Sequence, residues 1–211
     1  MSNYGEYTII YFEEDILQIK EILEIILNII FFHRYLTCKY FEDVQSKLNN
    51  ISYVKIKNEK ITKDLINKIN EIENNFQQNL NQYAQRLTLR FYEKEKNKKE
   101  EKNPWEIWNF ILILSKKENL IEKKDLKNKK EEIEDYKENK IRKFIFKIIE
   151  KLNDKNNYMP NITLNENSLS NETFVYDIQI ENISNKEDYL TLFNLFVKKN
   201  QENVIIIDNL S

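Results

Sequence analysis

The stretch Asp15–Arg34, DILQIKEILEIILNIIFFHR, decides the fold of this chain. Its isoleucines and leucines recur every three or four residues, which is the spacing of one helix face. A second apolar set occupies the adjacent face, at Ile22, Ile25, Ile29 and Phe32. An apolar arc of this width predicts a helix that is covered on most sides, at the centre of a globular core. Lys20, Glu21 and Glu24 interrupt the run, which excludes a membrane-spanning helix.

Composition limits the classes of function. The chain has 211 residues, with 33 basic and 35 acidic side chains and a formal net charge of −2. This balance provides no overall basic field to hold a nucleic acid. The length predicts one domain or two small ones. Cys38 has no second cysteine to pair with, and the N-terminal residues lack the basic and apolar regions of a signal peptide, so we expect a cytoplasmic protein.

Strands and helices alternate along the rest of the chain. β-branched or alternating segments predict strands at Tyr7–Phe12, near Lys39–Phe41, and at Ser52–Lys57, Leu87–Tyr92, Trp105–Leu114, Thr173–Ile180 and Val204–Asp208. Apolar residues at helical spacing predict helices at Thr62–Tyr83, with Thr62 as the N-cap, at Ile133–Leu152, and after Asn185. The expected fold class is α+β, with three main helices on a mainly antiparallel sheet, plus a C-terminal helix.

The segment that begins with PWEIW is predicted to form the central strand of the sheet. Trp105–Leu114 is apolar on both faces, which predicts a central strand with Trp108 in the core. Glu93–Asn103, just before it, consists mostly of Lys, Glu and Asn, which predicts a solvated loop. Because short connections usually join antiparallel neighbours, the strands on either side of this loop should form a hairpin.

The sequence offers few groups for catalysis. His33 is the only histidine, and no Ser-His-Asp or Cys-His motif accompanies it. One histidine and one cysteine make a zinc site implausible, and one glycine cannot build a glycine-rich nucleotide-binding motif. We therefore expect no metal and no cofactor. His33 and Arg34 end the central helix, where a cation is favoured by the helix dipole. The alternative function is a hydrolase that uses some of the abundant carboxylates.

Several segments resemble the autophagy-related protein 101 family. In chain order they are ILNIIFFHR, ISYVKI, LTLRFYEKEK followed by NPWEIW, IIEKLNDKNNYMP and FVYDIQI. They extend over most of the chain, up to about Lys199, and PWEIW after a lysine-rich segment is the most specific of them. The resemblance implies a single HORMA-like domain at residues 1–200, and residues 201–211 are then an extension containing the short strand expected there.

The resemblance also implies a function. Members of the family are non-catalytic adaptors that bind and stabilise the HORMA domain of autophagy-related protein 13 in the autophagy-initiating kinase complex. This chain is then expected to be a cytoplasmic protein that forms a heterodimer and is recruited to sites of autophagosome formation. No nucleic acid and no integral membrane segment are expected.

For the contact with this partner we expect the third helix, through Lys143, Phe146 and Lys147. A phenylalanine between lysines is unusual on a solvent-exposed face. Trp105, at the base of the charged loop, is the other expected contact residue. The family also carries a Trp-Pro-Phe finger in this loop. Here the loop contains no Trp, Pro or Phe, and Lys98, Lys99, Glu100 and Glu101 occupy the position of the finger, so its aromatic residues cannot be carried over.

Overall fold

The structure is a computed structural model that describes residues 5–13, 15–35, 40–46, 50–78, 84–93, 103–114, 130–154, 174–183, 191 and 204–208. The helices in this part of the chain are α1 (Ile16–Arg34), α2 (Glu59–Gln78) and α3 (Lys130–Leu152). The strands are β1 (Gly5–Glu13), β2 (Phe41–Gln45), β3 (Ser52–Ile56), β4 (Ala84–Glu93), β5 (Glu106–Leu114), β6 (Phe174–Ile183) and β7 (Val204–Asp208). This mixture confirms the α+β class.

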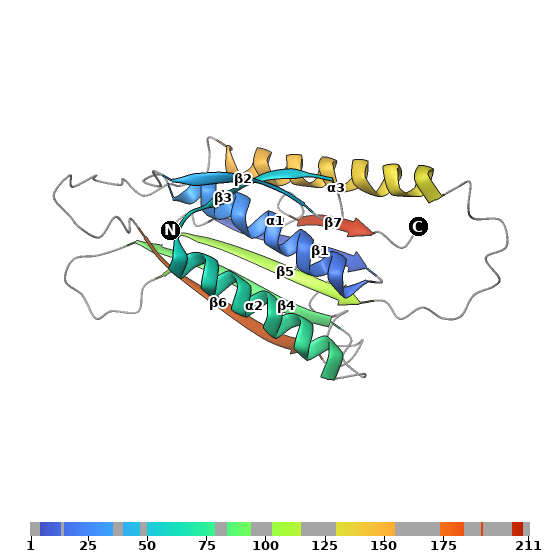
Figure 1. Cartoon of the computed structure of the whole chain (residues 1–211). Coiled ribbons are helices and arrows are strands. Elements are labelled where there is room, and N and C mark those ends of the chain that lie inside the picture. The colour runs from blue at the N-terminus through green and yellow to red at the C-terminus, as the bar shows by residue number, and fades with distance from the viewer. Residues whose placement is uncertain are drawn as a thin grey trace.

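The strands form one large sheet and one small one. The five-stranded sheet has the order β6-β4-β5-β1-β7, and the two-stranded sheet pairs β2 with β3. The expected hairpin of β4 and β5 is confirmed, and β4 is also antiparallel to β6, as β2 is to β3. In contrast, β1 is parallel to both β5 and β7. The large sheet is therefore mixed. Figure 1 shows α1 and α2 over the same face of it.

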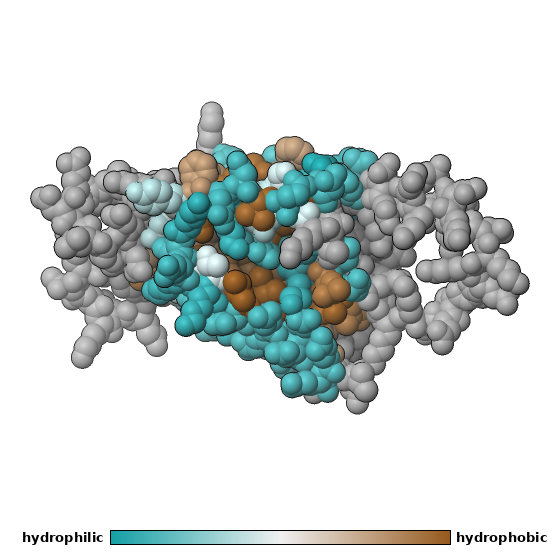
Figure 2. All heavy atoms as spheres, viewed as in Figure 1, coloured by the Kyte–Doolittle hydropathy of each residue, from teal (hydrophilic) through white to brown (hydrophobic). Residues whose placement is uncertain are grey.

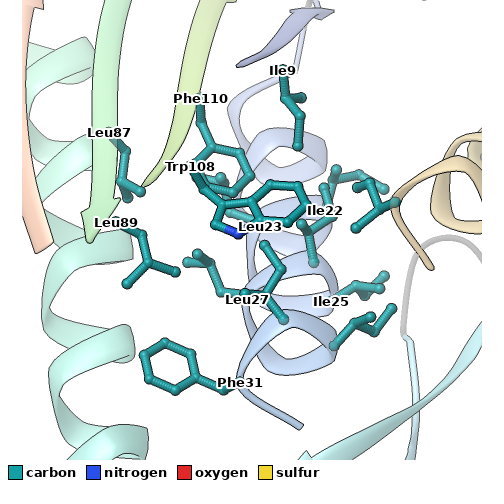
Figure 3. Close-up of a cluster of buried hydrophobic side chains, with 14 of the residues drawn as sticks. Ile9, Ile22, Leu23, Ile25, Leu27, Phe31, Leu87, Leu89, Trp108 and Phe110 are labelled. Carbon is teal, nitrogen blue, oxygen red and sulfur yellow. The ribbon is translucent and has the colours of Figure 1, made fainter. Parts of the chain in front are cut away.

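The core lies between α1 and the centre of the large sheet. Eleven residues of α1 are buried, which confirms that this helix is covered on most sides. Figure 3 shows Leu23 and Leu27 of α1 facing Trp108 and Phe110 of β5. Trp108 is fully buried, and its ring stacks on Tyr7 of β1 with the centroids 4.4 Å apart. Each large side chain buried here removes enough apolar surface from water to contribute about 1.5–3 kcal/mol.

β5 has the two covered faces expected of a central strand. Trp108, Phe110 and Leu112 point toward α1, and Ile111 and Ile113 on the opposite face are also buried. The strand lies between β4 and β1, so both of its edges are hydrogen-bonded as well. The apolar residues on both faces therefore predicted this position correctly.

Several boundaries differ from the sequence prediction, and two of the differences concern a helix cap and a strand position. Thr62 is not the N-cap of α2, because the helix begins at Glu59 and the backbone N–H of Ile61 donates to Asn58 Oδ1 over 3.1 Å. Asn58 caps the helix one turn earlier, as asparagine commonly does. The strand expected near Lys39–Phe41 extends instead from Phe41 to Gln45, where polar residues pair with β3.

The C-terminal part of the chain adds an edge to the large sheet. The strand expected at Val204–Asp208 is present as β7, which pairs with β1 in the register Thr8↔Val204 to Phe12↔Asp208. Of the helix expected after Asn185, the described residues include Thr191, which is helical, and the rest of that segment lies outside them. Among the helices that the structure describes, none is both long enough and apolar enough to cross a bilayer.

Candidate partner-binding surfaces

The third helix presents an outward face that includes three of the expected contact residues. Among the α3 side chains that the structure describes, the buried inward stripe includes Ile141, Phe144, Ile145, Ile148 and Leu152. Lys143, Phe146 and Lys147 are all exposed, and Phe146 has 64% of its surface open to solvent. Positions three and four apart lie on the same side of a helix, so Lys143 neighbours both Phe146 and Lys147, whereas Lys147 directly follows Phe146 and is rotated from it by about 100°. This face therefore combines one exposed aromatic side chain with two lysines that lie to one side of it.

Other large apolar residues are also exposed in the described part of the chain. They are Leu17, Tyr40, Phe41, Ile66, Val175 and Ile206. Figure 2 shows hydrophobic residues on one face of the molecule as separate patches among hydrophilic ones. Single exposed apolar residues are normal for soluble proteins, so exposure alone does not distinguish the face of Phe146.

Trp105 is not available as a contact residue, which corrects the sequence prediction. Only 6% of its surface is exposed. Its ring lies against Phe91, with the centroids 5.6 Å apart, and its backbone N–H donates to the carbonyl oxygen of Phe91 over 2.9 Å. Trp105, the residue before β5, is therefore already packed against β4, and its indole ring is part of the core and not of an exposed surface.

A buried ion pair lies beneath Trp105 at the C-terminal end of α1. Arg34 Nε is 2.6 Å from Glu106 Oε2, and both side chains are almost fully buried. Arg34 also donates from an NH1 proton to the carbonyl oxygen of Leu152 over 3.1 Å, and Trp108 Nε1 donates to the other carboxylate oxygen of Glu106. These bonds connect the ends of α1 and α3 to the first residues of β5.

The environment of Glu106 acts in two directions on its ionisation. Burial raises the pKa of the Glu106 carboxyl group above its ordinary value, because the charged form loses its hydration. The Arg34 guanidinium and the Trp108 N–H oppose this rise, since both stabilise the carboxylate. Arg34 stays charged at any physiological pH, and Glu106 is its countercharge. Arg34 therefore does more than interact with the dipole of α1. It forms a buried ion pair with Glu106 in the core.

The described residues also form a pocket of about 170 Å³ between the start of α2 and the start of β6. Its lining residues are Tyr35, Asn58, Lys60, Ile61, Asp64, Phe174, Val175 and Tyr176. The Tyr176 hydroxyl donates to Asp64 Oδ2 over 2.6 Å, so the one carboxylate in this lining is already hydrogen-bonded. General acid–base hydrolysis commonly uses two such groups, so the pocket gives the hydrolase alternative no support.

The remaining site predictions concern segments with less structural information. Lys98, Lys99, Glu100 and Glu101 lie outside the described residues, which stop at Glu93 and resume at Asn103. In the part of the chain that the structure describes, no group of three or more His, Cys, Asp or Glu side chains is placed to hold a metal ion.

Comparison with known proteins identifies the family. No curated protein sequence matches the chain. The model of the family described as autophagy-related protein 101 matches residues 12–166, roughly three-quarters of the sequence. This range begins in β1, includes α1, α2, α3 and the β4–β5 hairpin, and contains the residues of the buried ion pair. The chain therefore belongs to the autophagy-related protein 101 family.

Proposed function

We propose that this chain is a non-catalytic adaptor that binds and stabilises the HORMA domain of autophagy-related protein 13 in the autophagy-initiating kinase complex. The observation that carries this proposal is the family match over residues 12–166. The α+β architecture is compatible with a HORMA-like domain at residues 1–200, with β7 in the extension that follows. On this proposal the protein acts in the cytoplasm and is recruited to sites of autophagosome formation.

The outward face of α3 is our proposed contact surface for the partner. Phe146 supplies an apolar centre, and Lys143 and Lys147 supply charges that select the partner's orientation. Since Trp105 is buried and the charged loop contains no aromatic residue, neither provides the apolar anchor of the family's finger. If this chain also recruits downstream factors, another surface must supply the contact.

Co-purification tests the function directly. The full chain and an autophagy-related protein 13 HORMA domain are co-expressed, purified through a tag on the HORMA domain, and sized by light scattering. We expect a 1:1 complex whose partner unfolds at a higher temperature than the isolated HORMA domain. Recovery of the two proteins as separate monomers at micromolar concentrations would refute the proposal.

Two matched substitutions locate the contact. Phe146→Asp places a charge at the centre of the proposed surface, and Ile66→Asp makes the same kind of change on α2, where the side chain is 45% exposed. We expect Phe146→Asp to weaken partner binding at least about tenfold, because burying an unpaired charge is costly. Ile66→Asp should leave it unchanged. Equal affinities for the two variants, both folded, would place the interface away from α3 without changing the proposed function.

A further inference from the structure

The small sheet has an outer strand that is mostly open to solvent. Four of the five residues of β2 are exposed, and the residue before it, Tyr40, is 71% exposed. Phe41 is 54% exposed, and its ring makes an edge contact with Phe32 of α1 at a centroid distance of 5.8 Å. Figure 1 shows the β2–β3 pair apart from the five-stranded sheet. Tyr40 and Phe41 thus present two exposed aromatic side chains at the start of β2, and the ring of Phe41 also contacts α1.

The backbone of β2 presents hydrogen-bonding groups on its outer edge. Two bonds to the β3 side mark its inner edge, from Lys57 N–H to Tyr40 O and from Ser46 N–H to Ile51 O. In an antiparallel pair, every second residue of a strand hydrogen-bonds the neighbouring strand. Tyr40 and Ser46 both bond the β3 side, so Glu42 and Val44 between them do as well. The N–H and C=O groups of Phe41, Asp43 and Gln45 consequently point away from β3. No strand in the described part of the chain pairs with this edge.

The acidic side chains on β2 determine which charge a strand that pairs with this edge should carry. Glu42 and Asp43 are both exposed. Glu42 forms an ion pair with Lys57 over 3.5 Å, whereas Asp43 forms none with the residues that the structure describes. If two copies of β2 paired around a two-fold axis with all three outward residues bonded, the two copies of Asp43 would lie directly opposite each other. Like charges in that position are destabilising, so the sequence disfavours self-association through this edge.

We propose that β2 is a docking edge for an extended, basic segment of a partner protein, which adds to the β2–β3 sheet as a third strand. The outward groups of Phe41, Asp43 and Gln45 hydrogen-bond the added strand, as in other cases of strand addition. A lysine or arginine opposite Asp43 supplies the charge complement, and the aliphatic stem of a second basic residue, two positions along the added strand, packs on Phe41. None of these residues belongs to the outward face of α3, so this surface is additional to the contact proposed above.

A peptide of simple composition tests the edge. The probe is an acetylated and amidated hexapeptide that alternates lysine and valine, titrated into the full chain at 50 mM salt. We expect saturable 1:1 binding, weakened at least about tenfold by Asp43→Lys and unchanged by the matched control Glu71→Lys on α2. A peptide that alternates glutamate and valine should bind the Asp43→Lys variant better than the original chain. Equal binding of the lysine peptide to all three proteins would overturn the proposal.

The backbone contribution is tested separately from the charge. A hexapeptide N-methylated at alternate residues, on the edge that would face β2, keeps its charges but loses the donors. We expect its binding to fall to the level of free lysine. On the protein, Asp43→Pro removes an outward-pointing N–H and leaves the bonds to β3 in place, so it should abolish peptide binding while circular dichroism stays unchanged. If the methylated peptide binds as well as the original, the contact is not strand addition.

A last measurement separates this inference from the proposed function. The Asp43→Lys variant should bind the autophagy-related protein 13 HORMA domain with unchanged affinity, and the complex should still bind the lysine peptide. Displacement of the peptide by the HORMA domain would show that β2 belongs to that interface, and the proposal of an additional docking edge would then be wrong.

Discussion

The buried pair of Arg34 and Glu106 makes the most specific prediction about stability. Glu106→Gln is the informative change, because the amide keeps the size of the side chain and an oxygen for the Trp108 N–H. It removes only the negative charge. The guanidinium of Arg34 then remains in the core without its countercharge, with Nε no longer 2.6 Å from an anionic oxygen. An uncompensated buried charge of this kind costs about 3–5 kcal/mol.

A Coulomb estimate agrees with this range. Charge centres about 4 Å apart attract each other by about 4 kcal/mol at an effective dielectric constant of 20. The double variant Arg34→Met/Glu106→Gln removes both charges, and replacing a buried ion pair by neutral groups is often close to neutral. It also loses the bond from Arg34 to the Leu152 carbonyl oxygen, which costs about 1 kcal/mol. The double variant should therefore be more stable than Glu106→Gln alone.

Urea unfolding followed by circular dichroism measures all four proteins of this cycle. We expect each single variant to lose about 3–5 kcal/mol of unfolding free energy. The double variant should lose less than either, which corresponds to a coupling energy of at least about 3 kcal/mol. If the two single losses simply add within about 0.5 kcal/mol, the two side chains are not paired in the folded protein. Such a result would remove our explanation for the position of Arg34.

Three further predictions concern other parts of the molecule. Trp108→Ala should cost about 3–5 kcal/mol and lower the melting temperature by several degrees, and an unchanged melting temperature would contradict its place in the core. Tyr176→Phe removes the hydroxyl that donates to Asp64 and should cost about 1 kcal/mol in urea unfolding, whereas a loss below about 0.3 kcal/mol would mean that the bond does not persist in solution. Replacing residues 94–102 by a Gly-Ser linker of equal length should change the unfolding free energy by less than about 0.5 kcal/mol and leave partner binding intact, since exposed Lys–Glu pairs contribute little. A folded variant that no longer binds the partner would show that the charged loop carries part of the interface.

The sequence predicted the parts of the fold that local patterns determine. The wide apolar arc of α1 and the two apolar faces of β5 both indicate burial, and both elements lie in the core. The short connection between β4 and β5 indicated their hairpin correctly. The parallel pairings of β1 with β5 and β7 could not be derived in this way, because they join segments far apart in the sequence.

The ion pair was missed, although the sequence contains a signal for one of its members. Glu106 has the same parity as Trp108, Phe110 and Leu112, so on a strand it belongs to their buried face. A carboxylate there requires a partner, because few charged side chains are buried unpaired. No local pattern identifies that partner, since Arg34 precedes Glu106 by 72 positions. A cation in the last turn of α1 already has a sufficient explanation in the helix dipole.

The exposure of the candidate contact residues was predicted correctly for α3 but not for Trp105 or β2. Helical spacing placed Lys143, Phe146 and Lys147 outside the apolar stripe of α3, and all three are exposed. Trp105 adjoins a charged loop, which gave no indication that its ring packs on Phe91. The exposed strand β2 was largely missed, because FEDVQ shows neither β-branched enrichment nor regular alternation.

The position of β1 also determines when the protein can fold during synthesis. This strand is synthesised before the two strands that pair with it, Glu106–Leu114 and then Val204–Asp208. At ribosomal rates of about 5–20 residues per second, Thr8 waits on the order of 10–40 s for Val204. Throughout that interval the apolar stretch from Tyr7 to Ile10 has at least one open edge, which is the kind of segment that aggregates or recruits chaperones. A nascent chain stalled before residue 204 should therefore be held by chaperones, and its release should coincide with the arrival of β7.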